Sequence, residues 1–142
     1  KCENVFDVSK KFLENKKLKK DYDFLIVDFH AEITSEKMAI GHFFDGEATL
    51  VVGTHTHVPT NDCRILSNGT AYQTDAGMCG DYDSIIGMNK EISLNRFFKK
   101  TTDKNTPSNG EASLCGVIVN ANESTGLAKT AKSFIYSGKL ER

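Results

Sequence analysis

The stretch Ala48-Thr49-Leu50-Val51-Val52-Gly53-Thr54-His55-Thr56-His57 joins a short apolar run to two of the four histidines in the chain. The apolar part predicts a strand, and Gly53 begins the loop that leaves it. An earlier continuous apolar run, residues 23–30, predicts a strand buried on both faces, and it ends on His30. Both strands therefore carry histidine at or just beyond their C-terminal ends, where open α/β sheets place their binding sites.

The segments around these two strands predict an α/β fold. Apolar spacing favours an amphipathic helix over residues 5–20, whose last turn would carry a cluster of lysines where the helix dipole favours cations. A second helix is expected between the two strands, with Ser35 able to cap it and Asp45-Gly46 ending it. The order of strand, helix and strand is typical of an open α/β sheet.

Further elements are expected in the second half of the chain. Residues 70–75 predict another strand, which leads into a Gly-rich loop at residues 77–80. The remaining expected elements are a helix at residues 89–100 with Ile92, Phe97 and Phe98 buried, an exposed loop at 101–110, and a C-terminal β-hairpin of strands 114–119 and 131–136.

Length, composition and charge limit the classes of protein that fit this sequence. The 142 residues, 39% of them hydrophobic, suit a single domain spanning residues 1–142. A formal net charge of −1 gives no overall field that would recruit nucleic acid or an anionic membrane surface. Apolar runs are far shorter than a bilayer span, so we expect a cytoplasmic protein with no membrane partner. The cysteines form no CxxC pair and are expected to be reduced thiols: Cys2, Cys63, Cys79 and Cys115.

Three of the histidines form a candidate metal site. His55 and His57 can turn their rings toward one metal ion or two adjacent ions, and His30 can reach the same edge of the sheet. The alternative is that they are loop residues hydrogen-bonded to backbone. His42, inside the second predicted helix, is expected to be packed or solvated. Four acids are candidates to ligate metal or to orient the imidazoles: Asp28, Glu32, Asp62 and Asp75.

Six blocks of the sequence stand in a distinctive order and spacing. They are Asp28-Phe29-His30-Ala31-Glu32, Thr34-Ser35-Glu36-Lys37, Gly53-Thr54-His55-Thr56-His57-Val58, Gly69-Thr70-Ala71-Tyr72, Thr74-Asp75-Ala76-Gly77-Met78 and Tyr82-Asp83-Ser84-Ile85-Ile86-Gly87-Met88. In this order they resemble the YmdB-type calcineurin-like metallophosphoesterases of bacteria. The resemblance is strong over residues 23–98 and weaker elsewhere.

The resemblance implies part of an α/β metallophosphoesterase sandwich, in which helices cover two sheets. It also implies a phosphodiesterase that hydrolyses 2′,3′-cyclic nucleotides and related phosphodiesters through a dinuclear centre of iron, manganese or zinc. His30, His55 and His57 match metal-ligating histidines of the family. The other ligands and the catalytic histidine belong to an N-terminal half that this sequence lacks. The chain is therefore expected to be the C-terminal portion of the domain, with no catalytic residue assigned in it.

The residues beside the histidines extend the predicted site. Thr54, Gly77 and Met78 are candidates to line the substrate, with backbone turn geometry as the alternative for all three. The expected partners are a small phosphodiester or cyclic nucleotide, with RNA ends as a further substrate, and other copies of the full-length protein in a homo-oligomer. The candidates to support the metal ligands from behind are Asp28, Glu32 and Asp75.

Two other interpretations stay open at this point. The chain could be a metal- or nucleotide-binding module without catalysis, because the N-terminal ligands are missing. It could also be a structural α/β domain whose histidines are packed or solvated. In that case divalent metal would leave its melting temperature unchanged, because only a ligand that binds the native state stabilises it.

Overall fold

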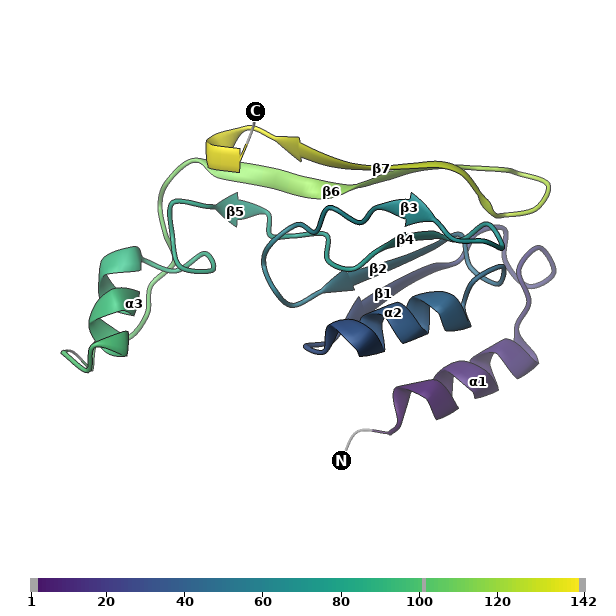
Figure 1. Cartoon of the computed structure of the whole chain (residues 1–142), viewed down its shortest axis with the longest axis horizontal. Coiled ribbons are helices and arrows are strands. Elements are labelled where there is room, and N and C mark those ends of the chain that lie inside the picture. Colours follow the sequence, from purple (N-terminus) through teal and green to yellow (C-terminus); the bar gives the residue numbers. More distant parts are fainter. Residues whose placement is uncertain (1–2, 101, 141–142) are drawn as a thin grey trace.

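The computed structural model describes residues 3–100 and 102–140, which fold as two sheets with helices (Figure 1). The first sheet has four strands in the order β1-β2-β4-β3. Its strands β1, β2 and β4 run parallel, and β3 pairs antiparallel with β4 at one edge. Their bounds are Ile26–His30 for β1, Leu50–Thr54 for β2, Arg64–Ile65 for β3 and Ala71–Gln73 for β4. This arrangement confirms the predicted α/β class.

The second sheet is antiparallel and lies over the first. Its three strands are β5 (Gly80–Asp81), β6 (Ala112–Ala121) and β7 (Ala128–Tyr136), in that order. β6 and β7 form the predicted hairpin, paired from Leu114 opposite Tyr136 to Ala121 opposite Ala128. Figure 1 shows this hairpin crossing above β3 and β4, and β7 contacts both of those strands. The sheets therefore form two layers.

Two helices cover the other face of the first sheet (Figure 1): α1 (Val5–Asn15) and α2 (Thr34–Phe43). The Asn4 side chain accepts hydrogen bonds from the first free N–H groups of α1, which fixes where that helix begins. α2 buries Ile40 against the sheet. The core formed there consists of Ile40, Phe44, Ala48, Val51, Leu66 and Tyr72.

Two predictions about helix ends are wrong. α1 ends at Asn15, so its last turn carries no basic residue, and Lys16 already has an extended backbone with φ −132°. The lysines lie in the turn that follows the helix. α2 begins at Thr34 after the cap residue Ile33, which makes no side-chain capping bond, so Ser35 lies inside the first turn and does not cap it. Gly46, with φ +89°, follows the end of α2 as expected.

The strand at residues 23–30 is not buried on both faces as predicted. β1 is an edge strand that pairs only with β2 among the described residues, and Ile26 is 66% exposed. A second wrong prediction concerns α3 (Lys90–Phe97), whose Phe97 is 78% exposed and is followed by Phe98, which is 67% exposed. α3 stands away from both sheets (Figure 1), so no layer covers these rings. The buried residue of α3 is Ser93.

The short strands β3 and β5 were not predicted, because two residues give no periodicity. A 3₁₀ turn, η1 (Gly138–Leu140), closes the described chain. Cys63, Cys79 and Cys115 are free thiols, and Cys2 lies outside the described residues. Within residues 3–100 and 102–140, no helix has the length and apolar character needed to cross a membrane.

Candidate metal centre

The pairing of β1 with β2 brings two histidines together. The strands are parallel and His30 lies opposite Thr54, so the end of β1 faces the loop that leaves β2. His55 Nδ1 is 3.1 Å from His30 Nε2, and the two ring planes are nearly perpendicular. A rigid sheet therefore delivers two imidazole nitrogens to one point at its carboxyl edge.

Among the described residues, His57 makes no hydrogen bond to this pair. Its Nδ1 lies 3.0 Å from the carbonyl oxygen of Ile86, and because a carbonyl only accepts, Nδ1 carries the proton and donates it. Nε2 of His57 is then the nitrogen with an available lone pair. Across residues 3–100 and 102–140, no three His, Cys, Asp or Glu side chains are grouped so as to hold a metal ion. The structure thus brings together two of the three predicted ligands.

The backbone of both loop histidines is strained. His55 has φ +121° and His57 has φ +65°, in the left-handed region that residues with a Cβ seldom adopt. Such conformations cost about 1–3 kcal/mol each and persist only where the surrounding structure holds them. They gather at functional sites, so this strain marks the loop independently of its histidine content.

Asp75 anchors this loop through hydrogen bonds. Its Oδ2 accepts a hydrogen bond from the backbone N–H of Thr56, the residue between the two histidines, at 2.9 Å. The same oxygen lies 2.9 Å from Lys37 Nζ in an ion pair whose two side chains are each 1% exposed. Burial by itself would raise the pKa of Asp75, but the hydrogen bonds from Thr56, Lys37 and Gly77 together lower it below its usual range. Asp75 is therefore a charged anchor.

A second chain of hydrogen bonds orients His30. His30 Nδ1 lies 3.1 Å from the Thr54 hydroxyl oxygen, and that hydroxyl donates to Asp28 at a longer 3.4 Å. Nδ1 of His30 is then the protonated nitrogen, and Nε2, which faces His55, has the lone pair. Asp28 and Thr54 therefore lie where they can orient His30 as a candidate ligand.

The other predicted acids lie elsewhere. Glu32 is exposed and makes no hydrogen bond to a histidine among the described residues. Asp62 accepts hydrogen bonds from Thr60, Thr74 and Arg64, so it braces two loops and touches no imidazole in the part of the chain described.

Tyr82, which the sequence analysis did not single out, ties the Gly-rich loop to the histidine loop. Its hydroxyl accepts from Met78 N–H at 2.8 Å and donates to the His57 carbonyl at 2.9 Å. Burial, followed by the hydrogen bond with Cys115, raises the pKa of Tyr82 well above its usual range, so the phenol keeps its proton. Gly77 has φ +85° and donates its N–H to Asp75 Oδ1 at 3.0 Å. The candidate substrate residues therefore adjoin the loop of His57.

A sequence profile of the family described as YmdB-like protein matches residues 1–134. The chain belongs to this YmdB-like family. One relative is the 2′,3′-cyclic-nucleotide 2′-phosphodiesterase of Bacillus subtilis, which is 49% identical over 102 residues, covering 72% of this chain and 39% of the relative. The YmdB-like chain therefore spans about two fifths of the length of that curated relative.

Two solved structures resemble the YmdB-like chain closely. A novel phosphatase from Mycoplasma pneumoniae superposes with a TM-score of 0.85 at 41% identity, covering 96% of this chain and 47% of that one. A hypothetical protein from Thermus thermophilus gives the same TM-score at 37% identity, covering 96% of this chain and 52% of that one. The chain thus corresponds to about half of each structure.

The donors of this YmdB-like chain fit a transition metal in kind and in spacing. Imidazole suits zinc and iron, and bonds of about 2.1 Å place neighbouring ligand nitrogens about 3.0–3.4 Å apart. The 3.1 Å between His30 Nε2 and His55 Nδ1, which is the length of a hydrogen bond between the two rings in this structure, also matches that separation. Two nitrogens are fewer than a metal site needs. The described residues therefore fit a centre only as part of its ligand set.

Proposed function

We propose that the full-length protein containing this chain is a metal-dependent phosphodiesterase. Its substrates would be 2′,3′-cyclic nucleotides or related phosphodiesters, RNA ends among them. The chain would contribute His30, His55 and His57 to a centre of two iron, manganese or zinc ions. The observation that carries this proposal is the approach of His30 Nε2 to His55 Nδ1 at the carboxyl edge of a parallel sheet. The name of the Bacillus subtilis relative supports the substrate class.

The contribution of this chain would be to position imidazoles. When bound, the two ions would supply Lewis acidity toward the phosphoryl oxygens and a hydroxide near neutral pH. Thr54 and Asp28 hold the protonated Nδ1 of His30, and the Ile86 carbonyl holds that of His57. Each of these bonds leaves Nε2 as the nitrogen with the lone pair, which is the form a metal requires.

The surrounding loops would exclude water and limit movement. Asp75 fixes Thr56 between the histidines, and Tyr82 joins His57 to Met78. Thr54, Gly77 and Met78 would then form a wall beside the phosphate. The general acid that protonates the departing ribose oxygen is not assigned to any residue of this chain. We also expect the full-length protein to assemble as a homo-oligomer, which light scattering would test.

Metal content and turnover of the full-length protein test the proposal together. We expect His30→Ala, His55→Ala and His57→Ala to lower tightly bound metal, measured by elemental mass spectrometry, and hydrolysis of 2′,3′-cyclic AMP. The loss should exceed about 100-fold, because even partners outside the ligand set contribute about 10–100-fold. His42→Ala is the matched control, since His42 is exposed on α2 and should change neither quantity. Full activity in the metal-free triple variant would refute the proposal.

A second candidate is a metal- or nucleotide-binding module without catalysis. It is favoured by the observation that the described residues contain no group of three metal-ligating side chains. Metal or cyclic-nucleotide binding by the full-length protein without any turnover, over iron, manganese and zinc, would select this candidate. Hydrolysis that depends on His55 would exclude it.

A further inference from the structure

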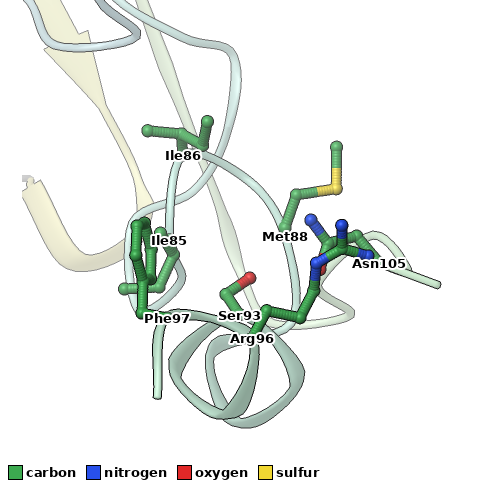
Figure 2. Close-up of a pocket in the computed structure, with 7 residues that line it drawn as sticks. All are labelled: Ile85, Ile86, Met88, Ser93, Arg96, Phe97 and Asn105. Atoms are coloured by element: carbon green, nitrogen blue, oxygen red, sulfur yellow. The ribbon is translucent and has the colours of Figure 1, made fainter. Parts of the chain in front are cut away.

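A cavity of about 270 Å³ lies beside α3, outside the histidine loop. It is formed where the segment before α3 meets the helix itself and the segment that follows it. Figure 2 shows its lining, with Ile85 and Phe97 gathered on one side, Arg96 and Asn105 on the other, and Ser93 between them. The residues that line it are Ile85, Ile86, Met88, Ser93, Arg96, Phe97 and Asn105.

The lining combines apolar walls with a few hydrogen-bonding groups. Ile85, Met88 and Phe97 supply the apolar surface, and Phe97 is 78% exposed, so a ring face is available for stacking. Arg96 donates from Nη1 to the Asp103 carbonyl at 2.9 Å, which holds the guanidinium at the rim. This mixture is typical of a site for a flat ring that has polar atoms on its edge.

Ser93 is the residue that points to a ligand. It is only 4% exposed, and its hydroxyl has no hydrogen-bond partner among the described residues. A serine within a helix commonly bonds to the carbonyl four residues earlier, and Ser93 Oγ makes no such bond to Asn89 in the described structure. Leaving a buried hydroxyl unpaired is unfavourable, so the group fits an incoming donor or acceptor. In Figure 2 its oxygen points toward the space between Ile85 and Met88.

The cavity is connected to the candidate metal centre through one residue. Ile86 lines the cavity, and its carbonyl oxygen accepts the hydrogen bond from His57 Nδ1 at 3.0 Å. Ile86 also has φ +50°, an unusual conformation for a β-branched residue, and Gly87 follows with φ +90°. This strained turn therefore both lines the cavity and contacts the imidazole of His57.

We propose that this cavity binds the nucleobase of the substrate whose phosphate meets the histidines. This inference rests on the proposed phosphodiesterase function and adds the recognition of the base to it. A base offers two apolar faces for Phe97, Met88 and Ile85, because every base has a π-face that can stack. The edge of a base carries hydrogen-bond donors and acceptors. A serine hydroxyl can accept from the donors or donate to the acceptors.

Two measurements on the full-length protein test the assignment. The first is the KM for 2′,3′-cyclic AMP against that for methyl ribofuranoside 2′,3′-cyclic phosphate, which has the same reacting group without a base. The second is binding of adenosine by titration calorimetry in the absence of metal. The variants are Phe97→Ala and Ser93→Ala. The matched control is Phe98→Ala, which removes a neighbouring ring that is 67% exposed and does not line the cavity.

We expect Phe97→Ala to weaken adenosine binding and to raise the KM for 2′,3′-cyclic AMP by about tenfold, the loss of one stacked base. Ser93→Ala should act in the same direction, while Phe98→Ala and the kcat/KM for the substrate without a base stay within about twofold of wild type. Adenosine binding that depends on Phe97, in a protein without hydrolytic activity, would support the cavity assignment and refute only the proposed function.

Normal hydrolysis with no effect of Phe97→Ala or Ser93→Ala on either measurement would overturn the assignment and leave the phosphodiesterase intact. Loss of oligomers in Phe97→Ala, without any adenosine binding by wild type, would also overturn it. That result would indicate that the apolar surface is an interface with a second copy of the chain.

Discussion

Asp75 and Lys37 form a buried ion pair directly beneath the strained histidine loop, and their environment decides how much the pair matters. Both side chains are 1% exposed, and the carboxylate also accepts from Thr56 and Gly77. Removing one partner of a buried pair leaves the other charge uncompensated, which is far more costly than losing an exposed pair. The anchor of the loop is therefore also a determinant of folding.

We expect Asp75→Asn to lower the free energy of unfolding by about 3–5 kcal/mol, because it strands the Lys37 ammonium. Lys37→Met should cost less, since Asp75 keeps the N–H donors of Thr56 and Gly77. Urea unfolding checks both. Lys90→Met is the matched control, because its 2.7 Å pair with Asp83 is exposed and should be worth less than about 1 kcal/mol. Equal small losses in all three variants would contradict this account.

The pH dependence of stability follows from the lowered pKa of Asp75. A carboxyl whose pKa is lower in the folded state than its usual 3.8 binds fewer protons when folded, so stability rises with pH through that window. The contribution is fully present above about pH 4 and is lost as the pH falls through the lowered value. We expect the difference between wild type and Asp75→Asn in urea unfolding to be constant from pH 5 to 7 and to shrink below pH 4. A difference that grows on acidification would show the opposite sign.

At this same scale, the sequence predicts which histidines approach each other better than it predicts the residues that hold them in place. His30 and His55 meet as expected, because both follow neighbouring strands. The burial of Lys37 could not be predicted, since an isolated lysine in a helix pattern is normally solvated. Tyr82 reaches the His57 carbonyl from 25 residues away, and no local pattern indicates such a bond.

Among the elements, β2 depends on one glycine. A Cβ on Gly53 would lie against the Thr74 carbonyl oxygen, far inside contact distance, while the Gly53 carbonyl accepts from Ala76 N–H at 2.9 Å. A side chain would push β2 away from the segment that carries Asp75. The strand therefore needs glycine here for close approach of backbones.

We expect Gly53→Ala to lower the free energy of unfolding by about 2 kcal/mol or more, since backbone cannot move aside as a flexible side chain can. Gly80→Ala in β5 is the comparison, because its new Cβ would meet Met78 Cγ at 3.2 Å and methionine can adjust. Thermal or urea unfolding of the two variants gives the answer. Similar stability in both would show that the Gly53 contact relaxes freely.

The existence of the main helices and strands was predicted well, but burial that depends on neighbouring elements was not. The hairpin of β6 and β7 follows from two strand-like stretches, residues 114–119 and 131–136, which are joined by a turn. The burial of β1 and of α3 depends on what packs beside them, and the described chain leaves Ile26 and Phe97 exposed. The spacing of Phe97 and Phe98 predicts a buried face, but no sheet lies next to it.

At the scale of the whole molecule, the edge that carries the histidines could be inferred from the sequence pattern, whereas the two layers were implied by the family resemblance. The order of strand, helix and strand requires a crossover, and it places the loops after β1 and β2 at one edge. The cavity beside α3 could not be inferred from the sequence. Ser93, Arg96 and Asn105 share no sequence pattern, and they meet because the chain returns past α3. Non-local contacts of this kind are decided by tertiary structure.

The unpaired side of β1 has a consequence for behaviour in concentrated solution. Among the described residues this strand bonds only to β2, so its other side presents backbone N–H and C=O groups next to exposed Ile26. Such an edge is a template for strands of other molecules.

We expect the 142-residue chain to self-associate reversibly, with a sedimentation coefficient that rises with concentration. Ile26→Lys should suppress this, and Ile33→Lys, at a 60% exposed position outside any strand, should not. Monomers at every concentration would mean that β1 resists pairing. Assembly that only Ile26→Lys prevents would mean that any binding or activity measured on the chain depends on its concentration.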